Sequence, residues 1–153
     1  MLENMLNYAL FRSVRANRVQ KQFLNCIESE LAEGFTELLL RLMSLVLFLN
    51  MDFRRNIKNF RGRYLFRSRD DEITVAAVFR DNRLRVYDKA IANTDVTVTF
   101  KDARALMNYI LSPKPDILGS ILRQDVVIDG NFNYLYKFAY MAKHLQLMAT
   151  GKA

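Results

Sequence analysis

The sequence predicts an α+β protein with a mainly antiparallel sheet of about five strands, and three observations support this fold class. Apolar residues recur every three or four positions up to about residue 53. They recur at every second position between residues 64 and 100, and return to helical spacing beyond residue 102. With 153 residues, 51% of them hydrophobic and 25% charged, the chain has the composition and length of one folded domain with one core.

The first part of the chain is expected to be helical. Residues 2–10 have one apolar face, and a longer series from Phe23 to Phe53 predicts either one long helix or two helices broken near Gly34. The longest charge-free run in that series, 42–51, has ten residues, whereas a membrane-spanning helix needs about 20. Because no secretory signal is visible either, we expect a cytoplasmic protein, with the inner membrane as a site of peripheral association.

Strands are expected in the middle of the chain, where apolar and polar residues alternate. Asp81 and Asn82 separate two of these strands as a two-residue hairpin turn, because both residue types tolerate the left-handed backbone that such a turn requires. The predicted strands are 64–67, 73–79, 83–87 and 96–100.

Helical spacing returns after residue 100. Asp102 is expected to cap a helix that Pro113 and Pro115 end. A short apolar helix, a strand that Gly130 closes, and a last helix are then predicted at 117–122, 126–128 and 132–145.

Catalytic and metal-binding chemistry find little support in the sequence. Because the chain has one cysteine, a cysteine-built zinc site is excluded. Because it has one histidine, the sequence gives little support to histidine-dependent catalysis. Asp125 and Asp129 share a strand face but lie about 13 Å apart, too far for a carboxylate dyad. Cys26 is expected to be an apolar core residue, and His144 to lie near a helix end. We therefore expect no enzyme, no metal and no cofactor.

The positive charge is concentrated near the middle of the chain. Residues 1–69 carry 12 basic and 6 acidic residues, whereas residues 70–153 carry 11 and 10. The segment 54–69 has seven basic residues and no acidic one. Such a segment is typical either of a solvated domain edge or of a surface for an anionic partner. The residues predicted to form an anionic-membrane surface are Arg54, Arg55, Lys58, Arg61, Arg63 and Arg67.

A resemblance to a known family rests on three segments. These are ITVAAVFRDNRLRVYD, NTDVTVTFKDARALMNYIL and DILGSILRQDVVIDGNFNYLYKFAYM. Their order resembles the sterol carrier protein type-2 domain, and the apolar segment before them is similar to the arrangement in bacterial ubiquinone-biosynthesis accessory proteins. The resemblance implies helices on one face of the sheet, enclosing an apolar tunnel for a sterol, fatty acyl or isoprenoid lipid, with no catalysis. It also implies an N-terminal helical extension, 1–54, before a lipid-binding domain, 55–153.

The predicted ligand-binding residues come from the apolar faces of the later helices. An ordinary packed core explains these faces equally well. The ten candidates are Leu106, Met107, Ile110, Leu118, Ile121, Leu122, Phe132, Leu135, Tyr136 and Ala139.

Two further functions stay open at the level of sequence. The segment 54–69 interleaves Phe60, Tyr64 and Phe66 with basic residues, a composition that also suits single-stranded nucleic acid, although nucleic acid is not the partner that we expect. Alternatively, the N-terminal helices form a scaffold that binds a lipid-pathway protein or a second copy of the chain. A lipid or another apolar small molecule is the partner that the sequence favours.

Overall fold

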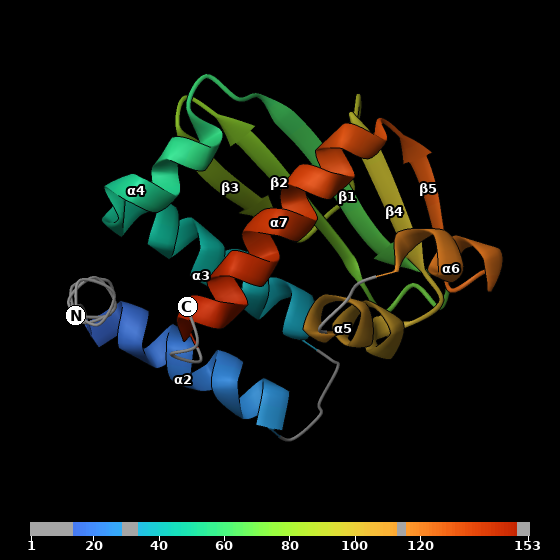
Figure 1. The fold of residues 1–153 in the computed structure, drawn as a ribbon, viewed down its shortest axis with the longest axis horizontal. Helices are drawn as coiled ribbons and strands as arrows, with labels where there is room; N and C mark the ends of the chain where they lie inside the picture. The colour runs from blue at the N-terminus through green and yellow to red at the C-terminus, as the bar shows by residue number, and fades with distance from the viewer. Residues whose placement is uncertain (1–13, 29–33, 113–115, 150–153) are drawn as a thin grey trace.

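The computed structural model describes residues 14–28, 34–112 and 116–149 (Figure 1). Two helices come first, and a short helix and a 3-10 turn lead into the sheet. The predicted helix at 2–10 and both prolines lie outside the described residues. The elements are α2 (Val14–Glu28), α3 (Phe35–Leu49), α4 (Met51–Arg54), η1 (Arg55–Ile57), β1 (Gly62–Ser68), β2 (Thr74–Arg80), β3 (Arg83–Tyr87), β4 (Val96–Phe100), α5 (Ala103–Leu111), α6 (Ile117–Leu122), β5 (Val126–Gly130) and α7 (Phe132–Ala149).

The five strands form one mixed sheet in the order β3-β2-β1-β4-β5. Every neighbouring pair is antiparallel except β1 and β4, which run parallel. The predicted α+β class and the mainly antiparallel sheet are therefore confirmed. The parallel pair at the centre is an addition that the alternation of residues does not reveal.

The turn between β2 and β3 has the predicted geometry. Arg80 pairs with Arg83, so that the loop contains two residues. Asp81 and Asn82 have φ angles of 54° and 59°, and two successive positive values identify the type I′ turn that suits the twist of a hairpin.

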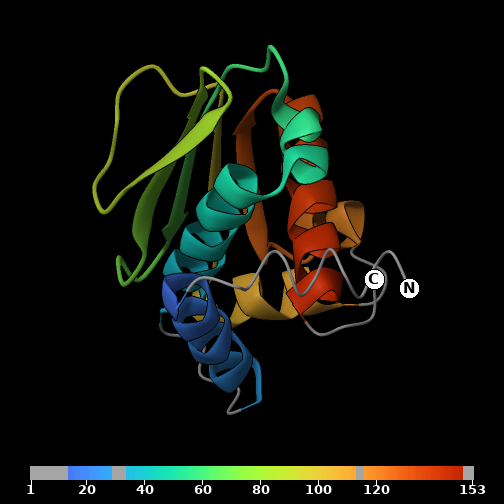
Figure 2. The same cartoon turned by 90° about the vertical axis from the view of Figure 1, so that its left-hand side faces the viewer.

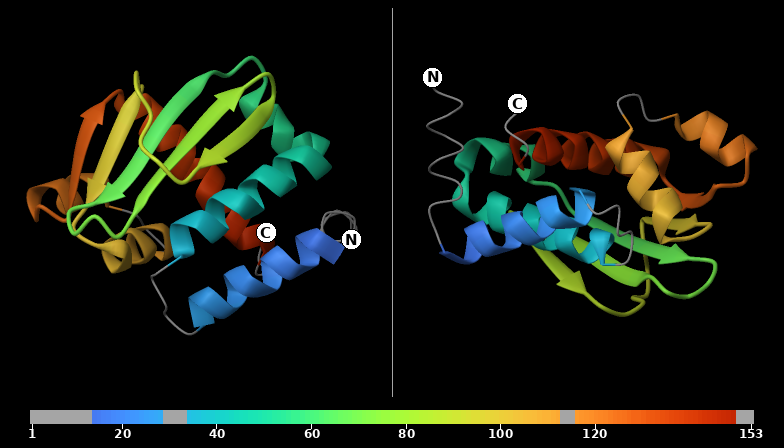
Figure 3. Two further views of the ribbon diagram at one scale, coloured as in Figure 1. Left: turned by 180° about the vertical axis from the view of Figure 1, so that it is seen from behind. Right: turned by 90° about the horizontal axis from the view of Figure 1, so that it is seen from below.

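The helices cover one face of the sheet, as Figures 2 and 3 show, and the core lies between the two layers. Alternation along β1 explains how this face is built. The rings of Tyr64 and Phe66 face the helices and lie 5.6 and 4.6 Å from the ring of Phe138 in α7. Arg63 and Arg67 of the same strand therefore belong to the opposite, outer face.

Within the described residues, α2 and α3 are separate helices, which confirms the second of the two predicted alternatives. Gly34 precedes α3 with a φ of 80°, a conformation that glycine adopts without steric cost. Phe23 of α2 and Phe35 of α3 stack with ring centroids 5.7 Å apart. The buried side chains of α3 belong to the same core as those of the sheet, and the predicted division at residue 54 stays a prediction.

The cap predicted for the helix after the fourth strand is also present. The Asp102 carboxylate accepts a hydrogen bond from the backbone N–H of Ala105 at 2.8 Å. In the portion of the chain that the structure describes, no helix combines the length and the apolar character needed to cross a bilayer.

Candidate functional site

A largely apolar groove lies between the C-terminal half of α3 and the β2–β3 hairpin. Its volume is about 770 Å³. The Ser44 hydroxyl donates a hydrogen bond of 3.0 Å to the carbonyl of Leu84, which fixes α3 against the edge strand β3. We call it the α3–hairpin groove, and its lining residues are Ser44, Leu45, Leu47, Phe48, Leu49, Arg54, Asp81, Asn82, Arg83 and Leu84.

One wall of this groove is built by the way in which α3 ends. The last carbonyls of a helix have no intrahelical partner. The Arg54 guanidinium supplies one, because its Nε donates to the carbonyl of Leu47 at 2.7 Å and its Nη2 donates to the carbonyl of Phe48. The sequence places Arg54 on a membrane surface, whereas the structure shows its guanidinium capping α3.

The chain then turns at Asn50, and this turn exposes three apolar side chains. The Asn50 side chain accepts a hydrogen bond from the N–H of Phe53 at 2.9 Å and so starts α4. Phe48, Leu49 and Met51 are 64%, 40% and 74% exposed. We call these three residues the apolar corner. Large apolar residues grouped on a surface are typical of an interaction site.

The ten predicted cavity residues lie in different environments, and none of them lines the α3–hairpin groove. Ile121 and Ala139 are half-buried. Four are buried in the core, namely Leu106, Met107, Ile110 and Leu135. Four are exposed, namely Leu118 at 68%, Leu122 at 83%, Phe132 at 40% and Tyr136 at 52%. As ligand contacts, the ten stay a prediction.

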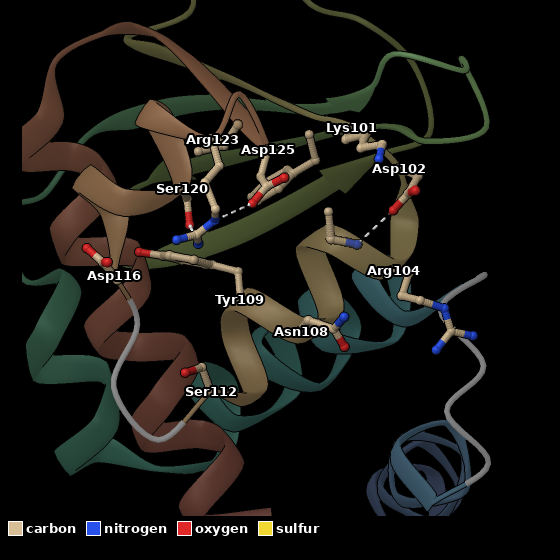
Figure 4. Close-up of a pocket in the computed structure, with 13 residues that line it drawn as sticks. Lys101, Asp102, Arg104, Asn108, Tyr109, Ser112, Asp116, Ser120, Arg123 and Asp125 are labelled. Atoms are coloured by element: carbon tan, nitrogen blue, oxygen red, sulfur yellow. Dashed lines mark hydrogen bonds and ion pairs between the residues drawn. The ribbon is translucent and has the colours of Figure 1, made fainter.

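A second hollow, of about 400 Å³, lies between α5, α6 and the start of β5, and ten of its thirteen lining residues are polar or charged (Figure 4). Its carboxylates already have partners. Asp102 caps α5, and Asp116 accepts a hydrogen bond from the N–H of Gly119 at the start of α6. Asp125 pairs with Arg123 at 3.0 Å. These carboxylates are therefore engaged in structural contacts.

Tyr109 contributes a buried hydroxyl to this polar hollow. Among the residues that the structure describes, the hydroxyl has no hydrogen-bond partner. Burial, and then the nearby Tyr136 and Asp116, raise the pKa of Tyr109 to about 12, so that the hydroxyl is neutral at physiological pH. It can donate a hydrogen bond to a small polar molecule, but it does not act as a base there.

His144 and Cys26 are both at least partly buried. The His144 ring lies 5.4 Å from the ring of Phe53, and its buried Nδ1 has no hydrogen-bond partner within the described residues. Cys26 is buried as predicted, and burial raises the pKa of its thiol. Over residues 14–28, 34–112 and 116–149, no group of three or more His, Cys, Asp or Glu side chains could hold a metal ion.

The predicted basic surface is divided between two places. Arg54 and Arg55 lie beside the apolar corner, where Arg55 pairs with Asp52 at 3.4 Å. Arg63 and Arg67 belong to the outer face of the sheet, where Arg63 donates to the carbonyl of Ala92 at 2.9 Å and Arg67 donates to the Thr99 hydroxyl at 3.2 Å. Lys58 and Arg61 are exposed.

Three arginines of the β2–β3 hairpin are site residues that the sequence analysis missed. Together with Arg63, they line a hollow of about 600 Å³, and Arg83 lines the α3–hairpin groove as well. The sequence does indicate that two of them lie together. Arg83 and Arg85 are two residues apart on the strand that follows the two-residue turn, so both side chains lie on one face of the sheet. The three residues are Arg80, Arg83 and Arg85.

The aromatic residues of segment 54–69 do not form a stacking surface. Tyr64 and Phe66 are buried, and Tyr64 donates a 2.7 Å hydrogen bond to the carbonyl of Tyr134. Phe60 packs near Phe79 with ring centroids 5.7 Å apart. These rings are used in the core, so that segment 54–69 lacks the exposed aromatic faces that single-stranded nucleic acid requires.

Comparisons with known proteins give the fold but no assignment by sequence. No family model matches the sequence, and no curated protein matches it. A stereoselective inverting sec-alkylsulfatase from Pseudomonas sp. has a similar structure, with a TM-score of 0.53 and 19% identity over 65% of this chain. The chain spans 16% of the length of that enzyme.

Two smaller proteins also match. The ubiquinone synthesis protein UbiJ-SCP2 matches with a TM-score of 0.49 and 11% identity, over 63% of this chain and 75% of its own. A conserved hypothetical protein from Thermus thermophilus, described as possibly a sterol carrier protein, matches with a TM-score of 0.40 and 16% identity, over 67% of this chain and 77% of its own. The likeness to the alkylsulfatase shows that the described part of the chain shares the fold of the matching part of that enzyme, and the similarity to sterol carrier protein type-2-like domains is a similarity of structure.

Proposed function

We propose that this protein binds a sterol, a fatty acyl chain or an isoprenoid or quinone-type lipid, and presents or transfers it without converting it. The α3–hairpin groove is the observation that carries this proposal. Its volume of about 770 Å³ lies within the range of about 300–1,000 Å³ that is usual for small-molecule sites. Five leucine and phenylalanine side chains supply most of its apolar wall: Leu45, Leu47, Phe48, Leu49 and Leu84.

Burial of the ligand supplies the binding free energy. Each buried methylene contributes about 0.8 kcal/mol, so that about twelve methylenes contribute about 10 kcal/mol. The lost freedom of the ligand and of the side chains offsets a part of this gain. Micromolar affinity corresponds to about 8 kcal/mol, so no polar recognition element is needed.

Four of the ten residues predicted from the helix faces define a second proposed position for the same ligand. Leu106, Met107, Ile110 and Leu135 lie in the core beneath α5 and α7. They would line a ligand if these helices moved away from the sheet. Substitutions in the groove and in the core distinguish the two positions.

Native mass spectrometry tests the proposal. The purified full-length protein is exposed to a mixed lipid extract, and we expect a protein–lipid mass. Leu45→Glu, at a half-buried position in the groove, is expected to abolish that mass. Val127→Glu, at a residue that is 50% exposed on β5, is the matched control and is expected to retain it. A protein that shows only its own mass after exposure to lipid contradicts the proposal.

An anionic membrane is the proposed place of delivery. Arg55, Lys58 and Arg61 are exposed in the segment before β1. A basic residue close to an anionic membrane contributes about 1 kcal/mol to binding. This attraction concentrates the protein at a surface that contains its ligand, consistent with peripheral association with the inner membrane.

A further inference from the structure

We propose that the apolar corner inserts into an anionic bilayer, with the arginines around it on the lipid headgroups, so that the α3–hairpin groove opens at the membrane surface. This inference rests on the proposed lipid-binding function and deepens it by assigning the place where lipid enters and leaves. The observation behind it is that the apolar corner and the groove share two residues, Phe48 and Leu49.

The corner has the form of an inserting element. Three large apolar side chains project at the point where Asn50 adopts an extended backbone (φ −114°, ψ 114°) between two helices. The most exposed of them, Met51 at 74% and Phe48 at 64%, contribute little to the core. Apolar side chains at such a position are stabilised when they enter the acyl boundary of a membrane.

Two elements that are distant in the sequence bring positive charge to this end of the molecule, where Arg54 and Arg83 line the same groove as Phe48 and Leu49. Figure 1 places α4 beside the turn between β2 and β3, and Figure 3 agrees. Arg55 follows α4, while Arg80 and Arg83 flank the turn. Two carboxylates lie among these cations: Asp52 is paired with Arg55 at 3.4 Å and Asp81 with Arg80 at 3.5 Å. With Arg54, the four arginines outnumber the two carboxylates, leaving net positive charge for anionic headgroups.

The chemistry of the corner favours a bilayer over nucleic acid. Of the three side chains only Phe48 offers a planar face for a base, whereas all three gain free energy on entering hydrocarbon. A second exposed apolar pair, Leu118 and Leu122 on α6, lies at the opposite end of the molecule (Figure 1). Because the proposed docking uses the end of the molecule where the corner lies, α6 serves as an internal control.

Met51 separates membrane docking from ligand binding because it does not line the groove. The sequence also contains no tryptophan. A Met51→Trp variant therefore carries one indole that reports on the polarity at the corner, and a Leu122→Trp variant reports on α6. Both positions are exposed, so that neither substitution is expected to disturb the core.

The experiment uses the full chain with vesicles of phosphatidylcholine alone or mixed with phosphatidylglycerol. We expect the indole emission of the Met51→Trp variant to shift to the blue with mixed vesicles, whereas that of the Leu122→Trp variant stays unchanged. In sedimentation with the same vesicles, Met51→Glu is expected to weaken binding by about tenfold or more. Arg80→Gln is expected to weaken binding by about fivefold. Leu122→Glu is expected to leave binding unchanged.

Three results overturn the inference: no emission shift in the Met51→Trp variant, a shift in the Leu122→Trp variant instead, or vesicle binding that Met51→Glu leaves intact. Binding of single-stranded RNA that competes with vesicles and is unaffected by Met51→Glu also overturns it in favour of a nucleic-acid surface. The lipid-bound mass of Met51→Glu distinguishes the two proposals. If this variant still takes up lipid, a failure of vesicle binding concerns the docking surface and leaves the proposed function intact.

Discussion

Arg54→Gln tests whether the arginine at the end of α4 is a structural cap for α3. The wild-type guanidinium donates from Nε to the carbonyl of Leu47 at 2.7 Å and from Nη2 to that of Phe48. Glutamine is shorter and uncharged, so that it reaches at most one of these carbonyls. We therefore expect the variant to be less stable than the wild type, with a frayed last turn of α3.

The magnitude follows from two contributions. Hydrogen bonds from a charged donor are worth about 1.5–3 kcal/mol, and the lower end of this range applies to a half-buried arginine. A cation at the C-terminal end of a helix adds about 0.3–1 kcal/mol. We expect Arg54→Gln to lower the free energy of unfolding by about 2 kcal/mol. For a chain of this length, the melting temperature falls by about 4–8 °C.

Thermal and urea unfolding followed by circular dichroism measure this effect. Arg55→Gln is the matched control: its side chain is 79% exposed and paired with Asp52 at 3.4 Å, so its loss changes stability by less than about 1 kcal/mol. Arg54→Lys keeps the charge without the forked donors and is expected to be intermediate. If Arg54→Gln and Arg55→Gln unfold at the same urea concentration, the capping argument is refuted.

Two further substitutions examine the turn and the polar hollow. Asn82→Gly is expected to raise the free energy of unfolding by about 0.5 kcal/mol, because glycine adopts a φ of 59° without strain; an unchanged urea midpoint would argue against strain at this turn. Burial raises the pKa of Tyr109 to about 12, so the unfolded chain ionises this residue first and stability falls as the pH rises from about 10 towards 12. Tyr109→Phe is expected to reduce that alkaline loss in unfolding measured across this pH range, and an identical slope would disprove the assignment.

The fold was predictable from sequence wherever local chemistry decides it. Alternating residues located the strands, and the Asp81-Asn82 turn was recognisable because few residue types adopt its backbone. The Asp102 cap was also local, since its partner is three residues away. The parallel pairing of β1 with β4 was not predictable, because Tyr64 and Val96 meet across an intervening hairpin and no local pattern encodes that contact.

The candidate site was harder to predict from the sequence than the fold. Helix faces give periodicity but not orientation, which is why Leu118 and Leu122 were grouped with Leu106 although only Leu106 is buried. The sequence predicts that the basic residues of segment 54–69 form one surface. In the structure, strand alternation places Arg63 on the outer face of the sheet, whereas Arg54 binds the carbonyls at the end of α3. Both outcomes depend on which elements become neighbours, and tertiary packing decides that.

The position of α3 also affects how the chain folds during its synthesis. Its side chains Leu39, Leu40 and Leu42 are fully buried, and α3 contacts β3, α5 and α7. The last of these partners is completed only at Ala149, about 100 residues after α3 leaves the ribosome. During synthesis at about 5–20 residues per second, the leucine side chains of α3 therefore lack their contacts with α7 for about 5–20 s. We therefore expect the nascent chain to bind chaperones that hold apolar helices, and truncation within α7 to promote aggregation.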